Sequence, residues 1–291
     1  MAGEAEPQVR AWVEYYRDLG VHDFYRRGDA VELSASEGDS AREVAAADVA
    51  AIASIEAPEV IPVETRAAAS AEPGMFAPPA MKLISFNDLA PLPVERIAVG
   101  ERGAALEAIQ AEIGDCTRCP LAYAGRHKIV FGDGSPAARL MFVGEGPGAD
   151  EDAQGIPFVG KAGQLLNNMI AAMGLARSEV YIANIVKCRP PGNRVPEPVE
   201  ATTCSQFLVR QIDVVRPEVI VALGSTAATY LLGVKRSLSG LRGHWHTCRG
   251  AKLAVTYHPA FLLRDPRQKA EAWKDLQMVM AELKLTPPAR K

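Results

Sequence analysis

No stretch of this sequence approaches the roughly 20 consecutive apolar residues that a membrane-spanning helix needs. Its first ten residues also lack the basic and then apolar regions of a secretory signal. These two absences exclude a membrane span and predict a cytoplasmic protein with no membrane partner. Because cytoplasmic thiols stay reduced, we expect the cysteines to be metal ligands or buried thiols, and not disulfides.

Charge and composition divide the chain unevenly. Residues 1–100 have 17 Asp and Glu against 8 Lys and Arg, a formal charge of −9, whereas residues 101–291 have 18 against 24, a charge of +6. A basic domain can approach a polyanion such as nucleic acid. An ordinary solvated surface explains a charge of this size equally well.

The first hundred residues have few signs of a folded core. Apolar residues at helical spacing predict one amphipathic helix within residues 1–27. Residues 28–100 are rich in Ala, Glu, Ser and Pro and poor in aromatics, so they predict an acidic flexible linker. The helix could dock on the main domain or recruit a protein partner, and we expect a monomer.

Residues 101–291 predict a single α/β domain. Four short apolar runs, at 140–143, 180–185, 219–223 and 253–257, alternate with helical patterns at 104–113, 164–173, 199–214, 226–231 and 270–283. Apolar strands separated by helices are typical of a parallel sheet covered on both faces, here a three-layer α/β/α sandwich with a mainly parallel four-stranded sheet. Such sheets bind ligands at the carboxyl ends of their strands, where the loops that follow the runs should converge.

Four of the five cysteines form two unequal pairs. Cys116 and Cys119 form a C-x-x-C, whereas Cys188 and Cys204 are separated by a proline-rich loop. Four thiolates from separate segments suit a four-iron cluster or tetrahedral zinc, and ordinary buried thiols are the third alternative. Cys248 has no partner at ligand spacing and is predicted to be structural.

Several motifs follow the predicted strands in a definite order. They are the loop from Gly144 to Asp152 with its sequence GEGPGADED, then GIPFVG, then Asn184 leading into KCRPPGNR, and finally His258-Pro259-Ala260. Together with the four cysteines they resemble the family 4 uracil-DNA glycosylases, the iron–sulfur members of the uracil-DNA glycosylase superfamily. The resemblance covers about residues 104–285. It implies a base excision repair enzyme with a [4Fe-4S] cluster on Cys116, Cys119, Cys188 and Cys204, and uracil-containing DNA, single- or double-stranded, as its partner.

Three residues are predicted to bind the base. Phe158 offers a flat face for stacking, a role that the resemblance also implies. Asn184 has an amide donor and acceptor that can match uracil, where cytosine presents the opposite pattern. A neutral His258 can donate to uracil O2 as the base departs. The ordinary alternatives are a core phenylalanine, an asparagine that caps a turn, and a structural histidine.

The loop that includes Gly146, Pro147 and Gly148 is predicted to contact the substrate, and its carboxylates are catalytic candidates. By family position Glu151 comes first and Glu145 second, as groups that stabilise positive charge on the sugar or orient water. Gly146 stands where better-known relatives have a water-activating aspartate, which favours a mechanism based on leaving-group stabilisation.

The remaining predictions concern DNA and the cluster. We expect Arg264 to enter the duplex beside the flipped base, and Lys161, Ser225 and Arg194 to contact DNA. The cluster is expected to be structural and to place Lys187, Arg189 and Arg194 near DNA. The competing functions are a non-catalytic iron–sulfur DNA-binding protein and a glycosylase for another deaminated base such as hypoxanthine.

Overall fold

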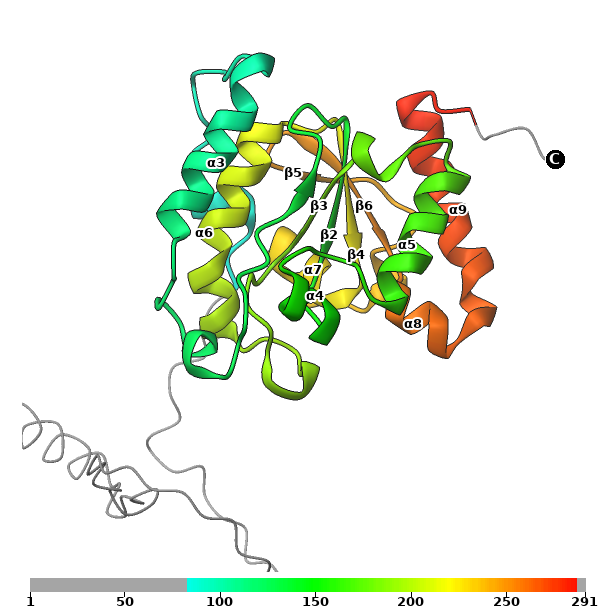
Figure 1. The fold of residues 1–291 in the computed structure, drawn as a ribbon. Helices are drawn as coiled ribbons and strands as arrows, with labels where there is room; N and C mark the ends of the chain where they lie inside the picture. Colours follow the sequence, from blue (N-terminus) through cyan, green and yellow to red (C-terminus); the bar gives the residue numbers. More distant parts are fainter. Residues whose placement is uncertain (1–82, 287–291) are drawn as a thin grey trace, which may run out of the picture. The chain divides into compact units, whose positions relative to one another are not determined.

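A computed structural model describes residues 83–286 of the chain. Its centre is one sheet of six strands in the order β1-β3-β2-β4-β6-β5 (Figure 1). The strands are β1 (Asp133–Gly134), β2 (Leu140–Gly144), β3 (Tyr181–Asn184), β4 (Val219–Leu223), β5 (His246–Cys248) and β6 (Ala251–Thr256).

The four inner strands, β3, β2, β4 and β6, are parallel, which confirms the predicted α/β class and parallel core. The edge strands β1 and β5 run antiparallel to β3 and β6. These two strands were not predicted, since Asp133–Gly134 and His246–Cys248 are too short and too polar to form apolar runs.

Alternate residues of the inner strands pack into two separate hydrophobic cores, one on each face of the sheet. In β2, Met141 and Val143 belong to one core, while Leu140 and Phe142 belong to the other. The first core is covered by α2 (Phe86–Leu89), α3 (Arg102–Ile113), α6 (Pro198–Val215) and α7 (Ser225–Leu232). The second is covered by α5 (Lys161–Ala172) and α9 (Lys269–Leu283). Figure 1 shows α3 and α6 on one side of the sheet and α5 and α9 on the other, so the three-layer prediction is correct.

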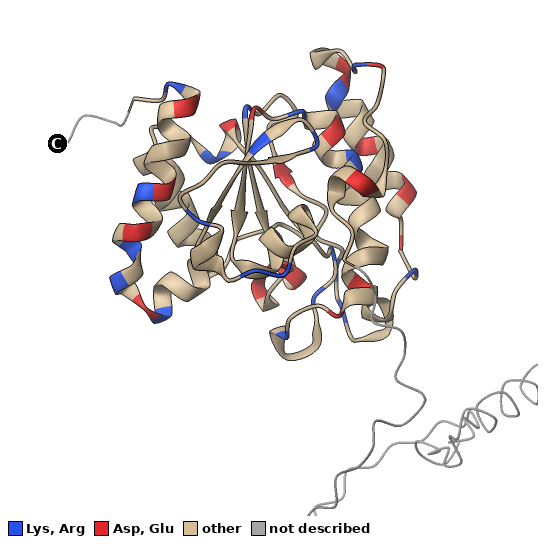
Figure 2. Ribbon diagram, turned by 180° about the vertical axis from the view of Figure 1, so that it is seen from behind, with Lys and Arg blue, Asp and Glu red and all other residues tan. Residues whose placement is uncertain are grey.

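Two short helices follow strands directly at the carboxyl edge of the sheet. α4 (Ala149–Gln154) begins five residues beyond β2, and α8 (Pro259–Arg264) begins just after β6. Single 3₁₀ turns are formed by Val99–Glu101, Pro120–Tyr123, Arg177–Glu179, Pro191–Asn193, Leu238–Gly240 and Pro266–Gln268. Charged residues lie mainly on the outer helices and loops (Figure 2). No helix among residues 83–286 is long and apolar enough to cross a membrane.

The segment before α3 packs on the first core, although the predicted linker includes it. Phe86 is 1% exposed. Ser85 lies close to Gly233: a Cβ added to Gly233 would be 2.4 Å from the backbone nitrogen of Ser85. Residues 83–100 therefore belong to the folded domain, and the predicted boundary at residue 101 is too late. The apolar residues of this segment have no helical or strand periodicity, so the sequence signal was too weak. The predicted helix in residues 1–27 and the rest of the linker lie outside the described residues.

Arg249 attaches this segment to the domain. Its side chain is fully buried and forms a bidentate pair with Asp213, at 2.6 and 2.7 Å. The same guanidinium donates to the backbone carbonyls of Phe86, Ala90 and Pro91 at 2.9, 2.6 and 3.0 Å. One cation therefore satisfies acceptors on two segments that are far apart in the sequence.

We expect Arg249→Met to lower the free energy of unfolding by about 3–5 kcal/mol, because it leaves Asp213 and three backbone carbonyls without a donor. Urea denaturation measures the change. The matched control is Arg139→Met, which breaks an exposed pair with Glu218 that water screens. Equal stabilities for the two variants would contradict this account of Arg249.

Candidate active site

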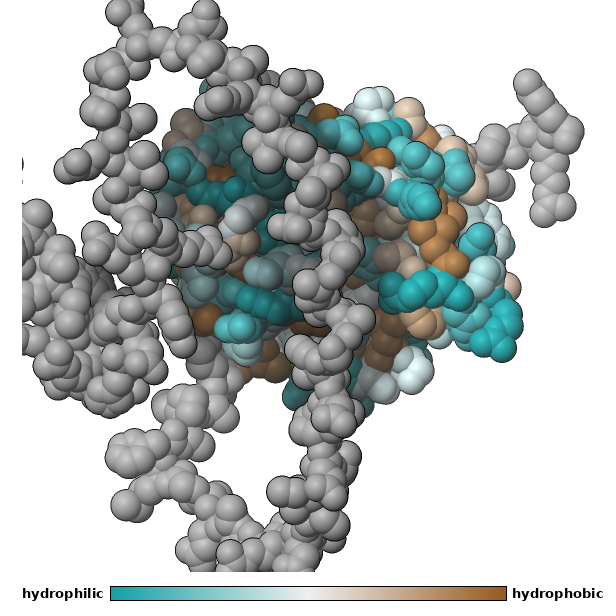
Figure 3. Space-filling model, turned by 60° about the horizontal axis from the view of Figure 1, so that its bottom comes forward, coloured by the Kyte–Doolittle hydropathy of each residue, from teal (hydrophilic) through white to brown (hydrophobic). Residues whose placement is uncertain are grey.

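One pocket of about 650 Å³ opens at the carboxyl edge of the parallel strands. Segments that follow β2, β3, β4 and β6 line it, as a parallel sheet requires. Figure 3 turns this edge toward the viewer and shows hydrophobic and hydrophilic residues side by side on it. The lining residues are 145–148, 151, 158, 162, 184, 190, 193–195, 223–225, 238, 257, 258, 260, 261 and 264.

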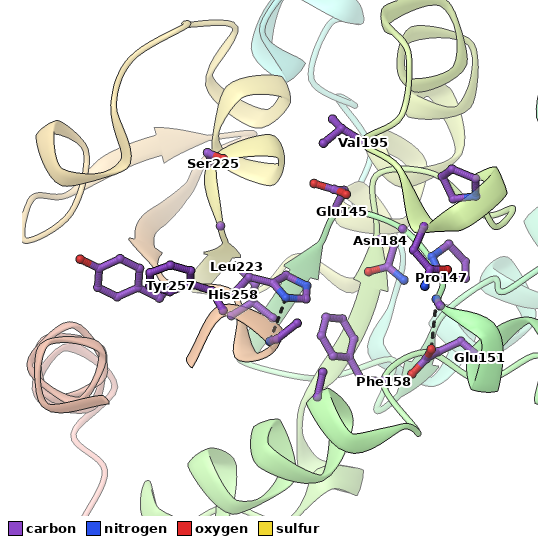
Figure 4. A pocket seen from close by; sticks show the side chains of 18 of the residues that line it. Glu145, Pro147, Glu151, Phe158, Asn184, Val195, Leu223, Ser225, Tyr257 and His258 are labelled. Atoms are coloured by element: carbon purple, nitrogen blue, oxygen red, sulfur yellow. Dashed lines mark hydrogen bonds between the residues drawn. The ribbon is translucent and has the colours of Figure 1, made fainter. Parts of the chain in front are cut away.

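Asn184 is the last residue of β3, and its side chain projects into the pocket (Figure 4). The residue is 2% exposed, and its Oδ1 atom is buried without a hydrogen-bond partner among the described residues. A buried amide oxygen without a donor costs free energy, so it is suited to accept a hydrogen bond from a ligand. This observation favours the predicted binding role over a turn cap.

Phe158 places its ring beside His258, with ring centroids 5.6 Å apart and planes at 34°. Figure 4 shows the ring between the side chains of His258 and Asn184. The backbone of Phe158 is in the left-handed region with φ of 53°, which is rare for a bulky residue. The residue therefore faces the pocket through an unusual turn, and is only 5% exposed.

His258 lies two residues after the end of β6 and is the N-cap of α8. The backbone N–H of Ala260 donates to its Nδ1 at 3.1 Å, so the proton of the neutral ring is on Nε2. Burial and, to a smaller extent, the nearby Arg264 cation lower the pKa of His258 to about 4, whereas Glu151 opposes the change. At neutral pH the pocket thus contains an uncharged imidazole with an N–H donor.

The carboxylates of the acidic loop have different environments. Glu151 accepts hydrogen bonds from the backbone N–H groups of Gly148, Val159 and Gly160 at 3.0, 2.9 and 3.0 Å. It therefore joins the loop after β2 to the segment that bears Phe158. Glu145 lines the pocket, and no described residue donates a hydrogen bond to its carboxylate.

Asp152, a third acid of this loop, points away from the pocket. It is 1% exposed and accepts hydrogen bonds from the backbone of His127 and Lys128 and from the His127 ring. Burial opposes ionisation of Asp152, but these hydrogen bonds outweigh it and lower the pKa of the carboxyl. Asp152 is therefore structural.

The predicted DNA-binding residues separate into two groups. Arg264 and Ser225 line the pocket and are exposed, and the exposed Lys161 precedes the pocket residue Ala162. Arg194 also lines the pocket, but its guanidinium forms a bidentate pair with the buried Glu200 at 2.7 and 2.8 Å. This pairing anchors the loop before α6. It also leaves fewer N–H groups of Arg194 free to bind a phosphate.

The four predicted ligand cysteines line one cavity with Ile113, Ile129 and Phe207. Three N–H groups point at sulfur atoms: Arg126 Nη1 at Cys188, Arg118 Nη1 at Cys116 and the backbone N–H of Lys187 at Cys204, at 3.3, 3.4 and 3.3 Å. Such donors suit sulfurs that bear negative charge. Burial raises the pKa of Cys204 to about 12, and binding of a metal to a protonated thiol releases its proton.

Within residues 83–286, no three His, Cys, Asp or Glu side chains are grouped as ligands of one metal ion. The four cysteines instead line a shared cavity that is formed by separate segments of the chain. Cys248 does not line this cavity and is fully buried, in line with its predicted structural role.

Lys187 does not face DNA, and the prediction that it would do so is wrong. It is 1% exposed, and its Nζ donates to the backbone carbonyl of Asn184 at 2.9 Å and to Gln211 Oε1 at 2.6 Å. Burial lowers its pKa to about 8. The KCRPP motif suggested a basic surface, but Lys187 lies inside, between the cysteine cavity and the base of the pocket.

Several pocket residues were missed in the sequence. Tyr257 stacks on Phe261 with centroids 5.2 Å apart, and the Arg242 guanidinium lies 4.1 Å from the Tyr257 ring centroid. Tyr257 directly precedes His258 at the end of a predicted strand, and this position could have identified it as a pocket residue. Val195 and Leu238 come from irregular loops, where no periodicity identifies them.

Comparisons with known proteins show which family this chain resembles. The family model described as the Uracil DNA glycosylase superfamily matches residues 131–277. A type-4 uracil-DNA glycosylase of Thermotoga maritima is 45% identical over 164 residues, which cover 55% of this chain and 84% of that protein. One of Archaeoglobus fulgidus is 40% identical over 182 residues, covering 60% and 91%. A type-5 uracil-DNA glycosylase of Pyrobaculum aerophilum is 29% identical over 180 residues, covering 50% and 78%.

The lowered pKa of His258 predicts a pH-dependent stability. The unfolded chain binds a proton at this residue below about pH 6.5, whereas the folded chain does so only near pH 4. Wild type should therefore lose roughly 2 kcal/mol more stability than His258→Gln between neutral pH and about pH 4.5. Urea denaturation at a series of pH values measures this. The exposed His244 provides the control, since His244→Gln should retain the wild-type dependence. The same dependence in His258→Gln would show that His258 is not held neutral.

Proposed function

Because the chain belongs to the uracil-DNA glycosylase superfamily, we propose that it removes uracil from DNA by hydrolysing the bond between the base and deoxyribose. The observation that supports this best is the buried, unpartnered Oδ1 of Asn184, which shares one pocket with an aromatic ring and a neutral imidazole. The pocket thus has an acceptor, a stacking face and a donor for one planar base.

Asn184 selects uracil by hydrogen bonding. Its Oδ1 accepts from the N3–H of uracil, and its amide N–H donates to O4. Cytosine has an acceptor at N3 and a donor at position 4, so it would leave the buried Oδ1 without a partner. A site built to hydrogen-bond one ligand rejects an analogue that leaves its polar atoms unpaired.

The base must leave the helical stack before it can enter this pocket. Flipping costs a few kcal/mol, and least for a mispaired or single-stranded uracil. Stacking on Phe158 offsets part of this cost, since one base on an aromatic ring contributes about 1–3 kcal/mol. Either form of DNA is then a substrate.

Bond cleavage depends on stabilising the departing base. The C1′–N1 bond breaks with its electron pair on uracil, and negative charge spreads to O2. The Nε2–H of His258 donates to this oxygen, and the loss of one such donor typically costs 10²–10³ in rate. Because its ring is neutral, His258 acts as a hydrogen-bond donor and keeps its proton.

The sugar becomes positively charged as the base leaves, and a water molecule then attacks C1′. The carboxylate of Glu145 accepts no hydrogen bond from any described residue, so it can orient this water and accept its proton. Glu151 contributes negative charge while its three backbone hydrogen bonds hold the loop in place. Departing uracil takes its proton from solvent.

DNA is bound by the exposed groups around the pocket. Lys161 contacts phosphates, and Ser225 offers the N-terminal end of α7. The exposed Arg264 enters the duplex beside the flipped base, and its exposed neighbour Leu263 on α8 helps to fill the gap that the base leaves in the stack.

The four cysteines hold a [4Fe-4S] cluster in this proposal. The shared cavity and the N–H donors to sulfur support it. Hydrolysis transfers no electrons, so the bound cluster supplies structural cross-links between the chain before β1 and the β3–α6 segment. These cross-links set the position of Asn184, four residues before Cys188.

Uracil release tests the function. Anaerobically purified protein is incubated with labelled DNA that has one U·G pair, and free uracil and alkali-labile abasic sites are measured. Asn184→Ala and His258→Ala should each lower the rate at least about a hundredfold, because each removes a group that contacts the base.

The controls are Asn168→Ala and His244→Ala, at exposed positions outside the pocket, which should retain full activity. If wild type binds DNA but releases no uracil, the proposed activity is wrong. Release of hypoxanthine instead would identify a glycosylase of another preference.

Cysteine substitution tests the cluster. Cys204→Ala should lose most of its iron and sulfide and melt at a lower temperature, because it removes one of four ligands. Cys248→Ala is the control, since this cysteine is also buried but lies outside the cavity. Iron analysis and thermal melting are the measurements. A Cys204→Ala protein with full iron content would contradict the assignment.

A further inference from the structure

The ring of Phe158 is useful as a stacking platform only if its backbone holds a conformation that the residue does not favour. Its φ of 53° lies in the left-handed region, where a side chain with a Cβ is strained. Surrounding contacts must therefore fix this turn. Two of them are made by residues that do not line the pocket.

The first contact is a close approach of α5. A Cβ on Gly163 would lie 1.9 Å from the carbonyl oxygen of Phe158 and 2.0 Å from its carbonyl carbon. The helix backbone therefore packs directly against this peptide group. Contact alone excludes other conformations on one side of the turn, but it gives the carbonyl groups no hydrogen bond.

The second contact is Arg177, in the 3₁₀ turn before β3. Its Nη2 donates to the carbonyl of Pro157 at 2.6 Å, and its Nη1 donates to the carbonyl of Phe158 at 3.1 Å. Nη1 also donates to Asn167 Oδ1 on α5 at 3.0 Å, and Nε donates to Asp133 Oδ2 on β1 at 3.1 Å. One planar guanidinium thus binds both carbonyls of the turn and two elements of the rigid domain.

Arg177 does not line the pocket, so it cannot touch a bound base. We propose that Arg177 is a positioning residue for the base-stacking platform: it fixes the left-handed turn at Phe158 and thereby aims the ring into the pocket. The inference rests on the proposed uracil-binding function. It adds a requirement for guanidinium geometry, because only a planar fork reaches both carbonyls and Asp133 together.

The test compares Arg177→Gln and Arg177→Lys with wild type in three measurements: uracil release from single-uracil DNA, inhibition by free uracil, and affinity for the same DNA without uracil. Both variants should weaken uracil release and inhibition about tenfold, within the range for loss of a base–aromatic stack. Affinity for uracil-free DNA should not change. Full activity in Arg177→Lys would show that charge beside Asp133 suffices, and would overturn the proposal.

A double-mutant cycle separates positioning from general stability. In a Phe158→Ala background, Arg177→Gln should cause no further loss of uracil release, because the ring that it positions is absent. Losses that multiply would show that Arg177 acts elsewhere, and would overturn the proposal. Weaker binding to uracil-free DNA would do the same, by making Arg177 a DNA contact.

Arg139→Gln is the matched control, because Arg139 makes an exposed ion pair at the start of β2, at the opposite edge of the sheet. It should behave as wild type in every measurement, and thermal melting of all variants identifies any that unfold. If wild type releases no uracil, the proposed function fails. If wild type and both Arg177 variants release it equally, only this inference fails.

Discussion

The pocket depends on a close approach that only glycine allows. Gly144 ends β2, and a Cβ at this position would lie 2.4 Å from Asn184 Oδ1 and 2.6 Å from the Phe158 ring. Asn184 and Phe158, the proposed hydrogen-bonding and stacking residues for the base, can therefore lie side by side only because β2 ends without a side chain. Parallel pairing of β2 with β3 sets Gly144 directly beside Asn184. Sheet register and the absence of one Cβ together determine the shape of the site.

The same strand end links the pocket to the cysteine cavity. Lys187 lies between them: its Nζ donates to the Asn184 carbonyl, and its backbone N–H donates to Cys204 Sγ. Gln211, on α6 with Cys204, accepts from Lys187 and donates to the carbonyl of Phe131 and to the Tyr181 hydroxyl. A buried ammonium is costly unless its hydrogen bonds are satisfied, so this network favours one arrangement of the segment. A cross-link at the cysteines would thus fix Asn184, the residue proposed to recognise the base, without contact between the two sites.

The sequence predicted the parts of this structure that have strong periodic or chemical signals. The four apolar runs became the inner strands, since residues buried on both faces leave a continuous pattern. Asn184 and His258 could be selected because polar residues at strand ends are conspicuous, and both line the pocket. Lys187 was misplaced on the surface because its burial depends on partners in α6 that are distant in the chain. The packing of Phe86 and the role of Arg177 also depend on long-range backbone contacts. Spacing along the chain cannot reveal an arginine that binds backbone carbonyl oxygens. Every residue has such an oxygen, so the sequence does not mark the ones that the arginine contacts.

The charge of the pocket depends on which carboxylates in and near it already have hydrogen-bond or ion-pair partners. Glu151 and Asp152 accept hydrogen bonds from backbone N–H groups, and Glu200 forms an ion pair with Arg194. Glu145 is the pocket carboxylate left without a donor in the described part of the chain. His258 stays neutral despite Glu151, because burial and the Arg264 cation outweigh that charge. An imidazolium beside a free carboxylate would form an ion pair and lose its freedom to donate to the base. Burial of the ring therefore leaves the pocket with both an uncharged N–H donor and a carboxylate, as the proposed mechanism requires.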